Sequence, residues 1–180
     1  TADVGMPKAE RARAMLNELN AHVDVEAFAQ RLTESNATAR LREATIVLDG
    51  TDDFSTRFAV NAACHELGLT LISGAVGRWD GQVATFKSGP TKHLPREQRL
   101  PCYRCLVPQT PPSAERCAEV GIIGALPGVI GSMMALEAIK EIAHTGDSLA
   151  GRLLIFDGLA ATARTIALPR DPACPVCGDG

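Results

Sequence analysis

Two pairs of cysteines share the spacing Cys-x-x-Cys: Cys102 with Cys105, and Cys174 with Cys177. In each pair the two intervening residues let the backbone fold back, so both sulfurs can reach one metal ion at about 2.3 Å. Four thiolates complete a tetrahedral zinc shell and leave no open position for a reactive water. The spacing therefore predicts one structural zinc that joins the end of the chain to its middle.

Two other uses of these thiols compete with a zinc site. The pairs could form disulfide bonds, or one pair could be a redox-active Cys-x-x-Cys motif. Two pairs of equal spacing are more typical of zinc knuckles than of either alternative. A further cysteine, Cys64, falls on the apolar face of an expected helix, which indicates core packing.

A second group of reactive side chains is acidic, because Asp49, Asp52 and Asp53 lie close together. They follow an apolar run, residues 45–48, that is typical of a parallel strand buried on both faces. Ligands bind beyond the carboxyl ends of strands in open α/β sheets, so these carboxylates can face a nucleotide or a metal. In a simpler interpretation, Asp52 or Asp53 only caps the next helix. One cap does not require three acids, so a binding role stays open beside capping.

The rest of the chain alternates helices and strands. Apolar spacing predicts helices over residues 8–19, 54–67 and 127–143, and strands over residues 22–28, 45–48, 69–72, 83–86, 153–156 and 165–168. Short connections between residues 45 and 72 predict a parallel β-α-β unit. We therefore expect an α/β fold in one domain over residues 1–180: a Rossmann-like, mostly parallel sheet with helices on both faces, an antiparallel extension and a zinc clasp of four cysteines.

Composition limits the class of protein. With 180 residues, 46% of them hydrophobic, the chain can bury one substantial core, and its net charge of −3 gives no basic excess for nucleic acid. The sequence lacks the run of about 18 apolar residues that a membrane span needs. We expect a cytoplasmic protein that binds neither nucleic acid nor membrane. Because it begins at Thr1 without an initiator Met or a signal peptide, the chain is expected to lack its natural beginning.

Several short motifs occur in the order seen in one family: residues 5–10, 48–54 with Arg57 and Asn61, 81–83, 102–106, 128–131 and 174–177. On these motifs the whole chain resembles the MoeB/ThiF/HesA family of ubiquitin-activating-enzyme-like adenylyltransferases. The resemblance implies a homodimeric enzyme that uses ATP to adenylylate the C-terminal Gly-Gly carboxylate of a ubiquitin-like sulfur-carrier protein, in molybdopterin- or thiamine-type sulfur transfer. A catalytically inactive, zinc-stabilised module that binds a ubiquitin-like protein is the alternative.

The resemblance also implies roles for individual residues. Lys8 matches the family's nucleotide-phosphate lysine, and Asp52 matches its catalytic aspartate near Mg²⁺ and the α-phosphate. Asp53, which is expected to bind the nucleotide with them, stands where family members commonly have Asn. The family's Gly-rich phosphate loop lies upstream of the segment that matches Thr1. This chain alone is therefore expected to bind ATP weakly and to be inactive, whereas the full-length protein is expected to be an adenylyltransferase.

Cys117 matches the position at which some family members form a covalent sulfur or thioester link with their carrier. The neighbouring Arg116 favours a reactive thiolate, whereas Glu115 and Glu119 disfavour it. Two hypotheses therefore remain for Cys117: a catalytic thiol that acts after adenylation, or an unreactive surface cysteine.

Overall fold

The computed structural model describes residues 4–112 and 121–179, and the chain divides into two compact units, residues 1–31 and 32–180. The first unit contains α1 (Lys8–Leu19), whose bounds agree with the predicted helix. The predicted strand over residues 22–28 is wrong, since these residues form turns and irregular backbone. Alternation produces a strand only beside another strand, and the sheet of the described chain does not include this segment. The single domain expected over residues 1–180 stays a prediction.

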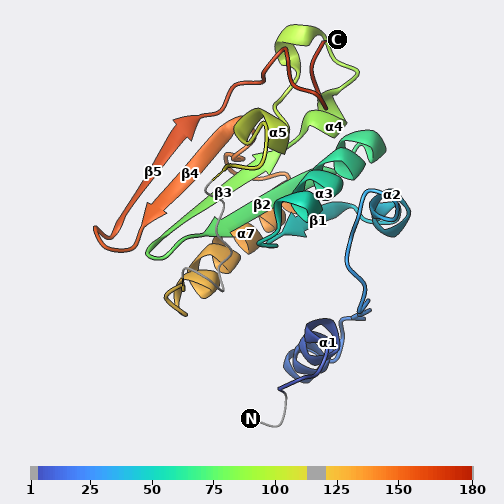
Figure 1. The fold of residues 1–180 in the computed structure, drawn as a ribbon, viewed down its shortest axis with the longest axis vertical. Coiled ribbons are helices and arrows are strands. Elements are labelled where there is room, and N and C mark those ends of the chain that lie inside the picture. The colour runs from blue at the N-terminus through green and yellow to red at the C-terminus, as the bar shows by residue number, and fades with distance from the viewer. Residues whose placement is uncertain (1–3, 113–120, 180) are drawn as a thin grey trace. The chain divides into compact units, whose positions relative to one another are not determined.

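The second unit is built on a five-stranded sheet whose strands lie in the order of the sequence (Figure 1). The strands are β1 (Ile46–Asp49), β2 (Thr70–Val76), β3 (Asp80–Phe86), β4 (Arg152–Asp157) and β5 (Thr162–Ala167). Strands β1 and β2 pair in parallel and are connected by α3 (Phe54–Leu67), which confirms the predicted β-α-β unit.

The α/β class, the antiparallel extension and the cluster of four cysteines are confirmed, but most of this sheet is antiparallel. Only β1 and β2 are parallel, whereas β2 with β3, β3 with β4, and β4 with β5 are antiparallel. A parallel pair needs a crossover of about a dozen residues or more, and α3 supplies one. The short turns after β2 and β4 can only return the chain antiparallel to itself. The expected parallel majority is therefore corrected for this chain.

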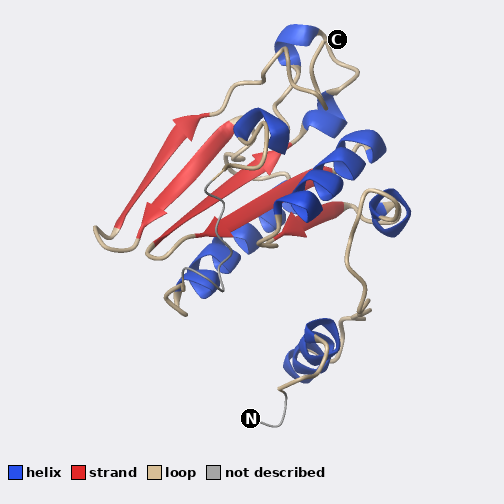
Figure 2. Cartoon of the chain, in the orientation of Figure 1, coloured by secondary structure: helices blue, strands red, loops and turns tan. Residues whose placement is uncertain are grey.

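Helices cover both faces of the sheet (Figure 2). Alternate residues of β2 belong to different parts of the core, because successive side chains of a strand point to opposite faces. Leu71 packs with Val60 of α3, whereas Ile72 packs with Met134 of α7 (Leu126–Ala143). The expected core position of Cys64 is confirmed, and burial raises the pKa of its thiol to about 12.

The two long helices are fixed against the sheet in different ways. Helix α3 ends at Gly68, whose φ of 75° is the left-handed conformation that commonly terminates helices. Helix α7 lies close to β2 and β3 because these strands carry glycines beneath it. A Cβ on Gly74 would lie 2.3 Å from Met134 Sδ, and one on Gly81 would lie 2.5 Å from Ile130 Cδ1. Neither position has room for a side chain unless Met134 or Ile130 shifts, or α7 moves.

Shorter helices occupy the connections: α2 (Ala37–Leu41), α4 (Ser88–Thr91), the 3₁₀ turn η1 (Arg96–Gln98) and α5 (Tyr103–Leu106). Helix α5 begins directly after Cys102 and therefore belongs to the first cysteine pair. Within the described residues, every helix is too short or too polar to cross a membrane.

Candidate active site and metal centre

Four cysteine sulfurs meet where the end of the chain lies beside α5. The Sγ atoms of Cys102, Cys105, Cys174 and Cys177 all lie within 4.8 Å of one another. The separation is 3.5 Å between Cys102 and Cys174 and 3.4 Å between Cys105 and Cys177. A tetrahedral shell with metal–sulfur bonds of about 2.3 Å has sulfur–sulfur edges of about 3.8 Å. The cluster has the right size for one metal ion, and all four cysteines are free thiols.

A tight turn shapes each cysteine pair. The Cys105 N–H donates to the Cys102 carbonyl at 3.0 Å, and the Gly178 N–H donates to the Cys174 carbonyl at 2.9 Å. A Cβ on Gly178 would lie 2.4 Å from that Cys174 carbonyl oxygen. The second turn therefore requires glycine after Cys177, because any side chain would push the two backbone segments apart.

Without a metal, the thiols hold their protons unequally. Hydrogen bonds from neighbouring thiols lower the pKa of Cys105 to about 2, and the Asp171 N–H adds to this effect from 3.4 Å. Hydrogen bonding to Cys105 and Cys177, together with burial, raises the pKa of Cys102. A bound cation would favour all four thiolates, which is the donor set of a closed structural site.

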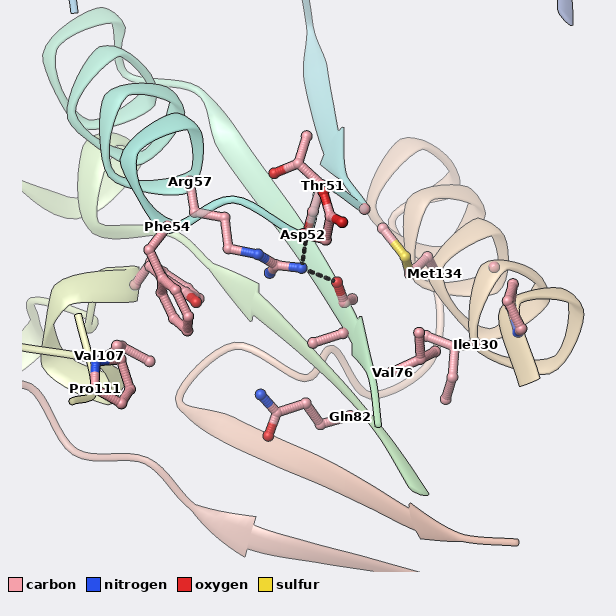
Figure 3. Close-up of a pocket in the computed structure, with 16 residues that line it drawn as sticks. Thr51, Asp52, Phe54, Arg57, Val76, Gln82, Val107, Pro111, Ile130 and Met134 are labelled. Atoms are coloured by element: carbon pink, nitrogen blue, oxygen red, sulfur yellow. Dashed lines mark hydrogen bonds between the residues drawn. The ribbon is translucent and has the colours of Figure 1, made fainter. Parts of the chain in front are cut away.

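A cavity of about 440 Å³ opens beyond the carboxyl ends of β1 and β2 (Figure 3). Its polar wall comes from the loop after β1, from α3 and from β3, and contains Thr51, Asp52, Arg57 and Gln82. Its apolar lining comes from β2, from α7 and from the segment after α5, and contains Val76, Ile130, Met134, Val107 and Pro111. Ile130 and Met134 lie across the cavity from Val107 and Pro111, with the polar side chains between them (Figure 3). This mixture suits a ligand that is itself partly charged and partly apolar.

The first two acids of the predicted cluster differ in their surroundings. Asp49 is buried, and its Oδ1 accepts hydrogen bonds from the Thr51 N–H at 2.9 Å and the Thr51 hydroxyl at 2.8 Å. These bonds fold the chain as it leaves β1. Asp52 comes next, lines the cavity and is exposed. Within the described residues, its carboxylate has no hydrogen bond or ion pair, so it is available to a ligand.

The third acid, Asp53, is the N-cap of α3. Its Oδ2 accepts hydrogen bonds from the Thr56 N–H at 3.0 Å, the Thr56 hydroxyl at 2.8 Å and the Ser55 hydroxyl at 2.6 Å. The capping role that the sequence left open for Asp52 or Asp53 therefore belongs to Asp53. Its predicted contact with a nucleotide stays a prediction.

Sequence reasoning assigned no role to two polar residues of the cavity, Arg57 and Tyr103. Arg57 follows the cap of α3 by one helical turn, so its position on the cavity side could have been inferred from helix geometry. Tyr103 lies between the first two cysteines, and its ring is 5.7 Å from the Arg57 guanidinium carbon. Burial raises the pKa of the Tyr103 phenol. Nothing in its spacing signals a cavity residue.

The predicted roles of Lys8 and Cys117 are not tested by the geometry of the second unit. Lys8 is the first residue of α1 and belongs to the first unit, whereas Asp52 and its cavity belong to the second. Cys117 lies outside the described residues. Their predicted roles therefore stay predictions.

Comparison with known proteins gives relatives along almost the whole chain. A sulfur carrier protein adenylyltransferase from Thermus thermophilus is 48% identical, and the match covers 99% of this chain and 65% of the relative. A molybdopterin-synthase adenylyltransferase from Salmonella typhimurium is 40% identical over 98% of this chain and 68% of the relative. The chain thus spans about two thirds of the length of these relatives.

Solved structures show the same fold at lower identity. A crystal structure of Escherichia coli MccB with MccA-N7isoAsn has a TM-score of 0.76 and 18% identity, over 99% of this chain and 53% of that chain. The model of the ThiF family matches residues 1–176. The chain therefore belongs to the ThiF family.

Proposed function

We propose that the protein containing this chain uses ATP to adenylylate the C-terminal carboxylate of a ubiquitin-like sulfur-carrier protein that ends in Gly-Gly. The observation that carries the proposal is the unpaired Asp52 carboxylate on the charged wall of the cavity, beyond the carboxyl end of β1. The names of the Thermus and Salmonella relatives, both adenylyltransferases, support it. The carrier activated in this way then serves sulfur transfer of the molybdopterin or thiamine type, in the cytoplasm.

In the proposed reaction, a carrier carboxylate oxygen attacks the α-phosphorus of ATP. An acyl-adenylate forms, and pyrophosphate leaves. Asp52 supplies a carboxylate oxygen to Mg²⁺, which lowers the cost of charge that develops on the phosphates. Lys8 contributes a cation to the phosphates, and Asp53 contacts the nucleotide while it caps α3. Asp52 acts through the metal rather than as a nucleophile.

The metal of the cysteine cluster is proposed to be zinc. Four thiolates with sulfur–sulfur distances close to a tetrahedral edge are the donor set and geometry that Zn²⁺ prefers. A closed shell of this kind stabilises the fold and takes no part in the reaction. Loss of the zinc is therefore expected to lower the free energy of unfolding more than it affects the reaction itself.

Cys117 is proposed to act after adenylation, if the carrier is held covalently. The acyl-adenylate forms without a thiol, whereas a thiolate is useful as the next acyl or sulfur acceptor. Cys117→Ala should therefore leave pyrophosphate exchange nearly unchanged and remove any denaturation-resistant adduct that alkali or thiol reductant releases. Gel analysis of the wild type with its carrier would show no such adduct if Cys117 is an unreactive surface cysteine.

The protein is also proposed to form a homodimer. Helix α7 carries an exposed apolar stripe in which Leu136, Ile139 and Ile142 are 60%, 58% and 65% exposed. A surface helix of a monomer rarely exposes so many aliphatic side chains on one side. Light scattering should give the mass of a dimer, and Ile139→Asp should shift it toward a monomer. A monomer mass for the unaltered protein would refute the dimer.

The direct test of the proposed activity is exchange of labelled pyrophosphate into ATP. Exchange should need Mg²⁺ and a carrier with a free C-terminal carboxylate. The same carrier with a C-terminal amide is the matched control, because it keeps the docking surface and lacks the attacking group. Carrier binding without any exchange would instead support the inactive binding module.

A further inference from the structure

Arg57 is a buried cation bonded to neutral acceptors. The residue is 5% exposed, and Nη1 donates to the Ser73 hydroxyl at 3.0 Å. Nη2 donates to the Gly74 carbonyl at 2.8 Å and to the Thr51 carbonyl (Figure 3). Among the described residues, no carboxylate forms an ion pair with it. Burial of a guanidinium without an ion pair costs free energy, so the hydrogen bonds of Arg57 indicate which segments its burial holds together.

The acceptors of Arg57 come from two neighbouring segments. Ser73 and Gly74 belong to β2, whereas Thr51 belongs to the loop after β1. The parallel register aligns Asp49 with Ser73, so the guanidinium bridges the point where β1 ends and its loop departs from the sheet. One planar group with donors on two nitrogens can join both segments, which a lysine ammonium on a flexible stem cannot do with the same geometry.

Thr51 is held from both sides. Arg57 binds its carbonyl oxygen, and Asp49 accepts from its N–H and its hydroxyl. The next residue is Asp52, whose carboxylate has no partner of its own among the described residues. The Asp52 backbone is thus held through its two neighbours, Thr51 on one side and the N-cap Asp53 on the other, rather than by any bond of Asp52.

We propose that Arg57 and Asp49 are positioning residues that clamp Thr51 and thereby hold the Asp52 carboxylate in place as a ligand for a divalent cation in the cavity. The inference rests on the proposed function, in which Asp52 holds Mg²⁺. Ligands of a metal are commonly oriented by such outer partners, and loss of an outer partner typically reduces metal affinity or activity by about 10- to 100-fold.

The test measures the Mg²⁺ dependence of carrier-dependent pyrophosphate exchange in the whole protein. Arg57→Lys should raise the Mg²⁺ concentration for half-maximal exchange by about tenfold or more and lower kcat. The KM for the carrier should stay within about twofold, because docking does not involve the clamp. A general loss of stability would instead reduce the active fraction without changing the Mg²⁺ requirement.

Two further variants make the result decisive. Ser73→Ala is the matched control, because it removes one acceptor of Arg57 and leaves both carbonyl bonds; its Mg²⁺ requirement should stay within about twofold of wild type. Asp49→Ala removes the hydrogen bonds to the Thr51 N–H and hydroxyl, and its Mg²⁺ requirement should also rise. This variant replaces Arg57→Lys in the test if Arg57→Lys does not fold. A wild type without exchange refutes the proposed function. A wild type with normal exchange, beside folded Arg57→Lys or Asp49→Ala with an unchanged Mg²⁺ requirement, overturns the clamp alone.

Discussion

The cysteine cluster and the Asp52 cavity are assembled in opposite ways. Each half of the cluster is a single tight turn, so the thiols are already paired within each Cys-x-x-Cys segment. The lining of the cavity comes from the loop after β1 and from β2, β3, α3, α5 and α7, and no short segment contains more than a part of it. A site made of local turns is visible in residue spacing, whereas a site made between elements depends on how those elements pack.

The two regions meet at Tyr103. It follows Cys102 of the cluster and also lines the cavity. Its N–H donates to Asn61 Oδ1 at 2.8 Å, and its ring packs edge-on against Phe86 at 5.8 Å between centroids. The cluster therefore supports one wall of the cavity. A substitution that disrupts the cluster should therefore also alter the cavity, whereas a substitution of Asp52 should leave the cluster unchanged.

The largest expected effect on stability is the loss of the metal. Cys174→Ala should lower zinc from about one ion per chain to none and reduce the free energy of unfolding by about 5 kcal/mol, a fall in Tm of about 10–20 °C. Elemental analysis and calorimetry measure the two quantities. Cys64→Ala, which removes a buried thiol outside the cluster, should retain the zinc and cost about 1 kcal/mol. Absence of zinc from wild-type protein never exposed to chelator would contradict the assignment.

A smaller effect on stability is expected from a substitution of Gly178, in the second cysteine turn. Gly178→Ala places a Cβ 2.4 Å from the Cys174 carbonyl oxygen, so the turn must open and its two sulfurs must separate. The change should cost about 1–3 kcal/mol and speed zinc release to a chelator. Gly128→Ala is the matched control, because nothing lies within 4 Å of its Cβ position on α7. Equal zinc release from both variants would show that the turn does not depend on Gly178.

The smallest expected changes in stability distinguish the adjacent acids Asp52 and Asp53. Asp53→Ala removes the N-cap of α3 and should cost about 1 kcal/mol of stability. Asp52→Ala should change stability by less than about 0.5 kcal/mol, because the Asp52 carboxylate has no bond to another described residue. Urea denaturation of both variants measures the difference. A larger loss for Asp52→Ala would mean that Asp52 is structural.

Prediction from sequence succeeded where a local signal decides the structure. The helix predicted over residues 54–67 has these bounds, one of the two acids considered as its cap is the cap, and the cysteine spacing predicted the cluster. It failed over residues 22–28, because alternation does not reveal whether a neighbouring strand exists. It also missed Tyr103, whose place in the cavity depends on how α5 packs against α3 and β3, whereas Arg57, one turn after the cap of α3, carried a usable local signal. Both failures concern contacts between distant segments.

The proposed roles, chemistry for Asp52 and stability for the cysteine cluster, are tested most directly by Asp52→Ala in the whole protein, assayed together with its carrier. Carrier-dependent pyrophosphate exchange should fall by about 1,000-fold or more, roughly 4 kcal/mol of transition-state stabilisation. Tm, zinc content and carrier binding should match the wild type, because Asp52 belongs to the chemistry and the cysteine cluster to the fold. Exchange within a few-fold of wild type would contradict the assignment of Asp52.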